Sequence, residues 1–142
     1  KKIVKYVDRK CSNMVSGGQL KGDVPPVLFP YIRPEDEDWH TRYEKYNQPG
    51  DYHNGGLWPF VVSFYIVALL KLGLIKKAEG LLLSLIKLVK KSKNPSLEYG
   101  FNEWYKAQTA DPSGQDWQTW SAANFIYAVK CFKKGKALYL ST

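Results

Sequence analysis

The stretch Gln48-Pro-Gly-Asp-Tyr-His-Asn-Gly-Gly-Leu-Trp-Pro59 begins as a loop and ends where a helix begins. Pro49-Gly50 is typical of a turn, and Gly55-Gly56 lets the backbone pass close to another part of the chain. Pro59 stands before an apolar run and suits the first turn of a helix, where its missing N–H costs no hydrogen bond. The stretch therefore predicts a loop that leads directly into a buried helix.

The side chains of this stretch form an unusual mixture of an acid, a phenol, an imidazole, an amide and an indole. Such a mixture suits a polyhydroxylated ligand, because an imidazole and an amide both donate and accept hydrogen bonds. We therefore interpret His53 and Asn54 as ligands for sugar hydroxyls. The alternative for His53 is a core histidine that fixes the loop. Trp58 is either a stacking platform for a sugar ring or the hydrophobic anchor of the helix start.

Helical spacing of apolar residues occurs in four segments: residues 2–15, about 58–72, about 75–91 and about 116–132. The second segment is apolar all round, which predicts an inner helix buried on all sides, and Gly73 ends it. The third has lysines opposite an apolar stripe, which predicts an outer helix. Asp116 is expected at the N-cap or in the first turn of the last helix. No alternation exceeds four residues, so we expect no strand and an all-α fold.

The remaining segments, 17–56 and 92–116, read as long loops, and the last residues, 133–142, as an outer turn or tail. Prolines at high density exclude a regular element from the first loop. Irregular segments of this length are usually functional. The acidic cluster at 35–38, followed by Trp39 and His40, is read as a solvated loop, with a metal site as the less favoured alternative.

Charge, apolar runs and cysteine spacing bear on whether the protein binds nucleic acid, a membrane or a metal. The formal net charge is +8, but the lysines concentrate in residues 1–5 and 71–93, where their spacing fits a solvated helix face. No nucleic-acid recognition motif accompanies this charge, so we expect no nucleic-acid partner. No signal peptide and no run of about 20 apolar residues is present, so a membrane partner lacks support. Cys11 and Cys131 show no metal spacing, which favours reduced structural thiols in a cytoplasmic protein.

A second block carries the chemistry: Phe101-Asn-Glu-Trp104, Gly114-Gln115 and Gln118-Thr-Trp-Ser-Ala122. Glu103 lies among aromatic residues, where a carboxylate loses hydration, one way in which a protein prepares a general acid or base. The structural alternative is a glutamate that caps a helix or pairs with a lysine. Gln118 and Trp120 are candidate sugar contacts, and Trp120 is the better candidate for a sugar-facing ring.

Both blocks resemble motifs of neutral/alkaline invertases and of bacterial amylo-alpha-1,6-glucosidase-like (glycogen-debranching) proteins. The resemblance covers roughly residues 24–132. It implies a segment of an (α/α)6 toroid and an inverting glycoside hydrolase for α-glucosides, with Glu103 as general base and no cofactor. The general acid of these families is an Asp upstream, outside this chain. The choice between sucrose and an α-1,6-linked glucan stays open.

The chain starts at Lys1 and enters a helical pattern at once. We therefore expect residues 1–142 to be the C-terminal portion of a single (α/α)6 glycosidase catalytic domain, with its N-terminal portion absent. Exposed apolar faces would then bind the remainder of the parent chain or a second copy. Without the acid, a truncated toroid that binds carbohydrate without turnover is the alternative function. A basic helical module that binds nucleic acid is a third hypothesis.

Overall fold

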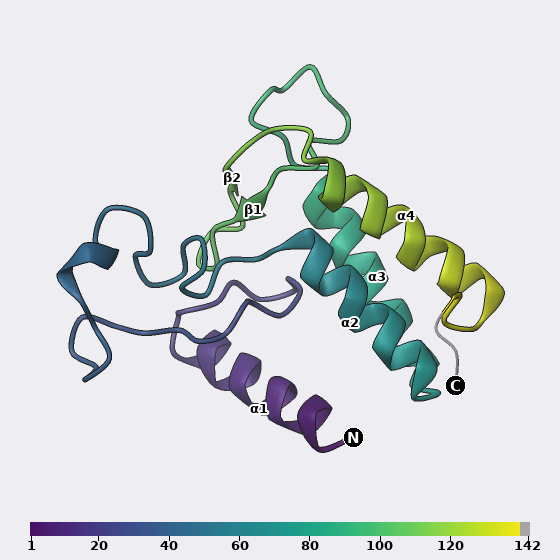
Figure 1. The fold of residues 1–142 in the computed structure, drawn as a ribbon, viewed down its shortest axis with the longest axis horizontal. Helices are drawn as coiled ribbons and strands as arrows, with labels where there is room; N and C mark the ends of the chain where they lie inside the picture. Colours follow the sequence, from purple (N-terminus) through teal and green to yellow (C-terminus); the bar gives the residue numbers. More distant parts are fainter. Residues whose placement is uncertain (140–142) are drawn as a thin grey trace.

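The computed structural model describes residues 1–139, which form a mainly helical fold (Figure 1). The helices are α1 (Lys2–Ser16), α2 (Pro59–Lys71), α3 (Ile75–Val89) and α4 (Thr119–Lys134), with a single 3-10 turn, η1 (Thr41–Tyr43). A small antiparallel ladder joins β1 (Trp104–Tyr105) to β2 (Pro112–Ser113). The prediction of four helices is confirmed. The prediction of no strand is wrong, because strands of two residues are too short to show alternation.

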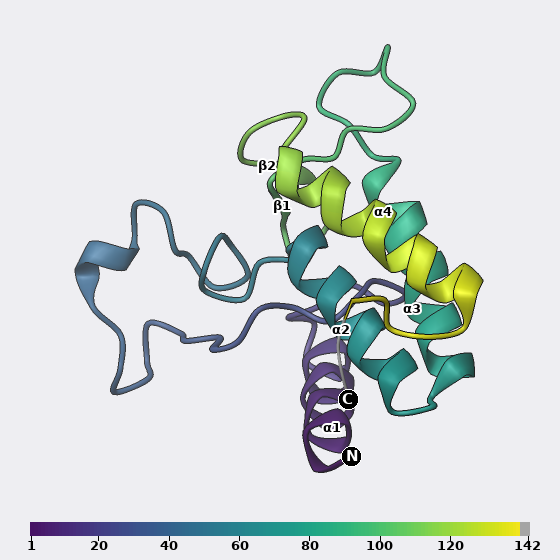
Figure 2. The same ribbon diagram turned by 45° about the vertical axis from the view of Figure 1, so that its right-hand side comes forward.

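The helices α2 and α4 lie side by side and run in the same direction, with their N-terminal ends near β1 and β2 (Figure 1). The helix α3 packs against α2 and runs in the opposite direction. The helix α1 also runs opposite to α2 (Figure 1). Gly73, with φ +72°, makes the tight turn between α2 and α3. The loop after α1 projects away from the helices around η1 (Figure 2). This arrangement brings two helix starts and their loops to one end of the bundle.

Pro59 is the first residue of α2, as predicted, and Trp58 is its N-cap. Ser63 donates its hydroxyl to the Pro59 carbonyl at 2.8 Å, which satisfies a polar group inside the core. The prediction that α2 is buried on all sides is wrong at Phe64, which is 52% exposed. The amphipathic character predicted for α3 is confirmed, because Ala78, Leu85 and other residues of its apolar stripe are buried and its lysines lie on the other side. Its outer place in a toroid stays a prediction.

The helix α4 begins at Thr119 and its N-cap is Gln118, so the predicted cap role of Asp116 is wrong. The Asp116 carboxylate instead forms an ion pair with Lys93. Two large apolar side chains of α4, Trp120 and Ile126, are 47% and 52% exposed. Together with Phe64 they leave apolar surface on α2 and α4 uncovered. The end of the predicted tail, residues 140–142, lies outside the described residues.

Both cysteines are free thiols on helices, as predicted, with Cys11 half-buried and Cys131 fully buried. Burial raises the pKa of the Cys11 thiol. No helix within residues 1–139 has the length and apolar character needed to cross a membrane.

Tyr65 on α2 supplies a stability prediction. Its hydroxyl oxygen is buried and finds no hydrogen-bond partner among the described residues. Burying an unpaired hydroxyl is unfavourable, so Tyr65→Phe should raise the free energy of unfolding by about 1 kcal/mol at pH 7. Urea unfolding of the two proteins at pH 7 checks this, and a less stable phenylalanine variant would contradict it.

The same residue predicts a pH dependence. Burial raises the pKa of Tyr65 to about 12, above the ordinary value of 10.0. Between pH 10 and 12 the unfolded chain therefore loses the phenolic proton while the folded chain keeps it, so the folded state loses stability as the pH rises. Tyr65→Phe should lose less stability than wild type between pH 9.5 and 11.5. Burial also raises the pKa of Tyr105, but that effect is common to both proteins and cancels in the comparison.

Candidate functional site

The structure brings the two motif blocks together through their backbones. Leu57 and Tyr105 exchange two N–H···O hydrogen bonds, each 2.8 Å long, and form an antiparallel bridge. Tyr105 also faces Pro112 in the small ladder, so three segments lie side by side. The loop that leads into α2 is thereby fixed against the segment that carries Glu103.

The segment before α4 is tied to the same place. Glu103 N donates to Gln115 O at 2.8 Å, and Gln118 N donates to Phe101 O at 2.9 Å. Trp117 N donates to Gly100 O at 3.2 Å. Residues 100–103 and 115–118 thus support each other, and Gln118 lies beside the segment of Glu103 at the start of α4.

Glu103 is half-buried, and its carboxylate Oε2 accepts a hydrogen bond from the backbone N–H of Gln115 at 3.1 Å. The neighbouring loop passes very close to it, since a Cβ on Gly114 would lie only 2.4 Å from Oε2. Glu103 neither caps a helix nor pairs with a lysine within the described residues. Neither structural alternative considered for this carboxylate therefore applies.

Three rings of the first block form a cluster with Trp104 of the second block. The Tyr52 and His53 rings stack with centroids 4.1 Å apart and an interplanar angle of 20°. The Trp58 ring lies 5.2 Å from each of them. Trp104, the residue after Glu103, meets the Tyr52 ring edge-on at 6.0 Å. The rings of Tyr52 and Trp104 thus meet between the block that carries His53 and the block that carries Glu103.

Asn54 is buried and its amide is used within the protein. Its Oδ1 accepts from Ile32 N at 2.6 Å, and its Nδ2 donates to Ile32 O at 2.7 Å and to Asn47 O at 2.9 Å. Trp58 is only 4% exposed and donates its indole N–H to Tyr52 O at 2.9 Å. For Trp58 the structure therefore favours the anchor over the stacking platform. Both side chains build the loop and lie behind its surface.

The other predicted contacts are accessible. His53 and Trp120 are exposed, and Gln118 is half-buried. Sequence reasoning missed Asn47, whose Oδ1 accepts from His53 N at 3.1 Å and fixes the loop from the side. An Asn six positions before the histidine belongs to no recognised pattern, so the sequence carried no signal for it.

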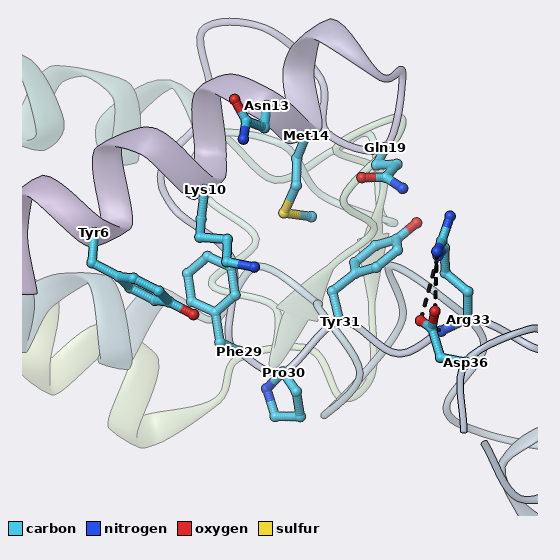
Figure 3. Close-up of a pocket in the computed structure, with 10 residues that line it drawn as sticks. All are labelled: Tyr6, Lys10, Asn13, Met14, Gln19, Phe29, Pro30, Tyr31, Arg33 and Asp36. Carbon is cyan, nitrogen blue, oxygen red and sulfur yellow. Dashed lines mark hydrogen bonds and ion pairs between the residues drawn. The ribbon is translucent and has the colours of Figure 1, made fainter. Parts of the chain in front are cut away.

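A hollow of about 320 Å³ adjoins His53, and it is lined by Pro30, Ile32, Asn47, His53 and Asn54. A larger hollow of about 590 Å³ lies between α1 and the segment 29–36 (Figure 3). Tyr6, Lys10, Tyr31 and Arg33 line it, and it contains none of the predicted site residues. Pro30 lines both hollows, whereas Ile32 lines only the smaller one and Tyr31 only the larger one.

Two residues of the acidic cluster at 35–38 form ion pairs with an arginine. Arg33 pairs with Glu35 at 3.1 Å and with Asp36 at 3.0 Å, and the hydrogen bond from Arg33 lowers the pKa of Asp36. No three His, Cys, Asp or Glu side chains in the described part of the chain lie close enough together to hold a metal ion.

These observations define a helical protein in which two polar and aromatic motif loops meet at the N-terminal ends of two parallel helices. The chain belongs to the alkaline and neutral invertase family, whose family model matches residues 1–135. The invertase half of the resemblance is thus confirmed, and the debranching-like half stays a prediction.

Three plant proteins illustrate the likeness. Alkaline/neutral invertase C, mitochondrial, of Arabidopsis thaliana is 26% identical over 137 residues, which is 93% of this chain and 18% of that protein. Alkaline/neutral invertase E, chloroplastic, of the same plant is 28% identical over 131 residues, covering 89% and 19%. Neutral/alkaline invertase 1, mitochondrial, of Oryza sativa subsp. japonica is 26% identical over 129 residues, covering 87% and 18%. The chain spans less than a fifth of the length of these relatives.

Proposed function

We propose that this chain forms part of the active site of a glycoside hydrolase that cleaves sucrose. The observation that carries the proposal is the pairing of Leu57 with Tyr105, which holds the two invertase-like motifs in one place. Membership of the invertase family supports sucrose as the α-glucoside. The parallel inner pair α2 and α4, with α3 running the opposite way, agrees with a segment of an (α/α)6 toroid.

The proposed reaction proceeds with inversion. Glu103 acts as general base and takes a proton from the water that attacks the anomeric carbon. Oε2 is held by Gln115 N–H, while Oε1 makes no hydrogen bond within residues 1–139 and is the oxygen we assign to the water. A second carboxyl group, about 6.5–9.5 Å away in inverting enzymes, must protonate the leaving oxygen. We place it outside this chain, because the resemblance implies an Asp upstream of these residues. Asp51 is engaged in an ion pair with Lys106 at 3.5 Å.

The remaining site residues divide into two groups by their exposure. His53, Gln118 and Trp120 contact the sugar: the first two through hydrogen bonds to hydroxyls and Trp120 through its exposed ring. Asn54 and Trp58 position the loop from behind, because their polar atoms already have partners. No metal or organic cofactor takes part in this scheme.

The exposed apolar side chains Phe64 and Ile126, which have no role at the sugar, point to a macromolecular partner as well. We propose that the remainder of the parent polypeptide, or failing that a second copy of this chain, covers part of this surface. A chain that stays monomeric by analytical ultracentrifugation and unfolds cooperatively on its own would contradict this.

A substrate panel tests the proposed activity. The full-length protein is incubated with sucrose and with a branched α-1,6-linked glucan, and glucose and fructose release are measured. Release of both sugars from sucrose supports the proposal, whereas glucose from the branched glucan alone selects the debranching-like alternative. Saturable sugar binding without release of either sugar selects the carbohydrate-binding alternative.

His53 supplies a more specific prediction. Loss of one hydrogen bond to a sugar hydroxyl should lower kcat/KM for sucrose roughly tenfold in His53→Ala. The matched control is His40→Ala at the only other histidine, which lies before η1 and accepts from Arg42 N at 3.1 Å. His40→Ala should leave kcat/KM within twofold of wild type. Equal losses in the two variants would remove His53 from the proposed site.

A further inference from the structure

Lys93 lies outside both motifs, in the loop after α3, and reaches across to the segment before α4. Its ammonium group donates a hydrogen bond to the carbonyl of Gly114. It also forms an ion pair with Asp116, with 3.3 Å between Nζ and Oδ1. Gly114 and Asp116 flank Gln115, whose backbone N–H binds the Glu103 carboxylate. One lysine thus holds the chain on both sides of the group that fixes Glu103.

The Asp116 carboxylate extends this connection into the core. It accepts a hydrogen bond from Nδ2 of Asn102, the residue before Glu103. Asn102 is fully buried, and its carbonyl accepts from Ser121 Oγ on α4 at 3.3 Å. The segment 114–116 is therefore held both by the side chain of Asn102, the residue before Glu103, and by the ammonium group of Lys93.

Gly114 lies directly against the Oε2 side of the carboxylate. A Cβ on Gly114 would lie 2.4 Å from Glu103 Oε2 and 2.8 Å from a ring carbon of Trp104. A shift of the 114–116 segment would therefore move Glu103 directly, because nothing separates them. Displacement of a reacting group by about 1 Å can cost up to a hundredfold in rate.

We propose that Lys93 is a positioning residue for the Glu103 carboxylate and acts through the segment 114–116. The proposal rests on the proposed role of Glu103 as general base. Lys93 needs no contact with substrate for this role, and its own charge does not enter the reaction. Its loss should consequently reduce kcat and leave KM nearly unchanged.

The test is made in the full-length protein with sucrose. Lys93→Met removes the ammonium group and keeps the apolar stem, and it should lower kcat at least tenfold with KM within twofold. Lys93→Arg, which can still donate to both oxygens, should recover most of kcat. The control is Lys90→Met, which removes an equal charge from a lysine whose Nζ lies 4.0 Å from Glu98 Oε1. Unchanged kcat in Lys93→Met, or an equal loss in Lys90→Met, would overturn the proposal.

A double-mutant cycle tests whether Lys93 and Asp116 affect kcat through the same interaction, which a general loss of stability would not imitate. Asp116→Asn removes the carboxylate charge that Lys93 binds, so kcat of the double variant should match the worse single variant. Multiplied losses would mean that the two residues act independently and would also overturn the proposal. The failures are distinguishable: if Glu103→Gln keeps full activity, the proposed function fails, and if only the Lys93 variants keep it, this inference alone fails.

Discussion

Glu103→Gln is expected to lower kcat on sucrose by about 10²–10⁴-fold, the usual contribution of a general base. The amide has the size of the carboxylate, and its carbonyl oxygen can still accept the N–H of Gln115. It cannot take a proton from water, so the chemical step fails while the sugar contacts remain. Sucrose binding, measured by calorimetry, should therefore stay within a few-fold of wild type.

The matched control for this experiment is Glu98→Gln. Glu98 is an exposed glutamate of the same loop, and its carboxylate lies 4.0 Å from Lys90 Nζ. We expect kcat of this variant to stay within twofold of wild type, because among the described residues neither Glu98 nor Lys90 is bonded to the segment 114–116 that holds Glu103. A protein that hydrolyses sucrose equally well with glutamine at position 103 would remove Glu103 from catalysis.

Asn54→Asp is expected to cost about 2–4 kcal/mol of folding free energy, the largest effect on stability that we predict. The side-chain amide donates two hydrogen bonds, to Ile32 O and Asn47 O. An aspartate would bring a buried carboxylate oxygen against the same two carbonyls and lose both donors. The loop that carries His53 would separate from residue 32, so sucrose hydrolysis should also fall.

The control is Asn47→Asp. The Oδ1 of Asn47 accepts from His53 N, and an aspartate oxygen can accept the same hydrogen bond. This variant should therefore lose less than 1 kcal/mol by urea unfolding. If both aspartate variants lose equal stability, the amide donors of Asn54 have no special role in the fold.

The helices could be predicted from the sequence because their signals are local. Apolar residues recur at helical spacing, Pro59 marks one start, and Gly73 marks one turn. Observed ends lie within a few residues of the expected ones. The bridge between Leu57 and Tyr105 could not be predicted, because the choice of a distant backbone partner leaves no periodic pattern.

The sequence identified the polar residues of the two motif loops, but it did not show which way their side chains point. Sequence placed Asn54 and Trp58 in a binding loop, yet their polar atoms bind backbone groups that only the tertiary structure brings near. Asp116 has the residue type of a helix cap, but its carboxylate instead accepts a hydrogen bond from the buried Asn102 and pairs with Lys93. The role of a polar side chain is decided by its distant partners, which a motif does not encode.

The most direct measurement of the central claim follows the first sugar released from sucrose by proton NMR, using the full-length protein. Water activated by Glu103 attacks the glucosyl anomeric carbon from the face opposite the leaving fructose, so we expect β-glucose before mutarotation. α-Glucose as the first product would contradict inversion at that carbon, and a complete absence of hydrolysis would contradict the proposed activity itself.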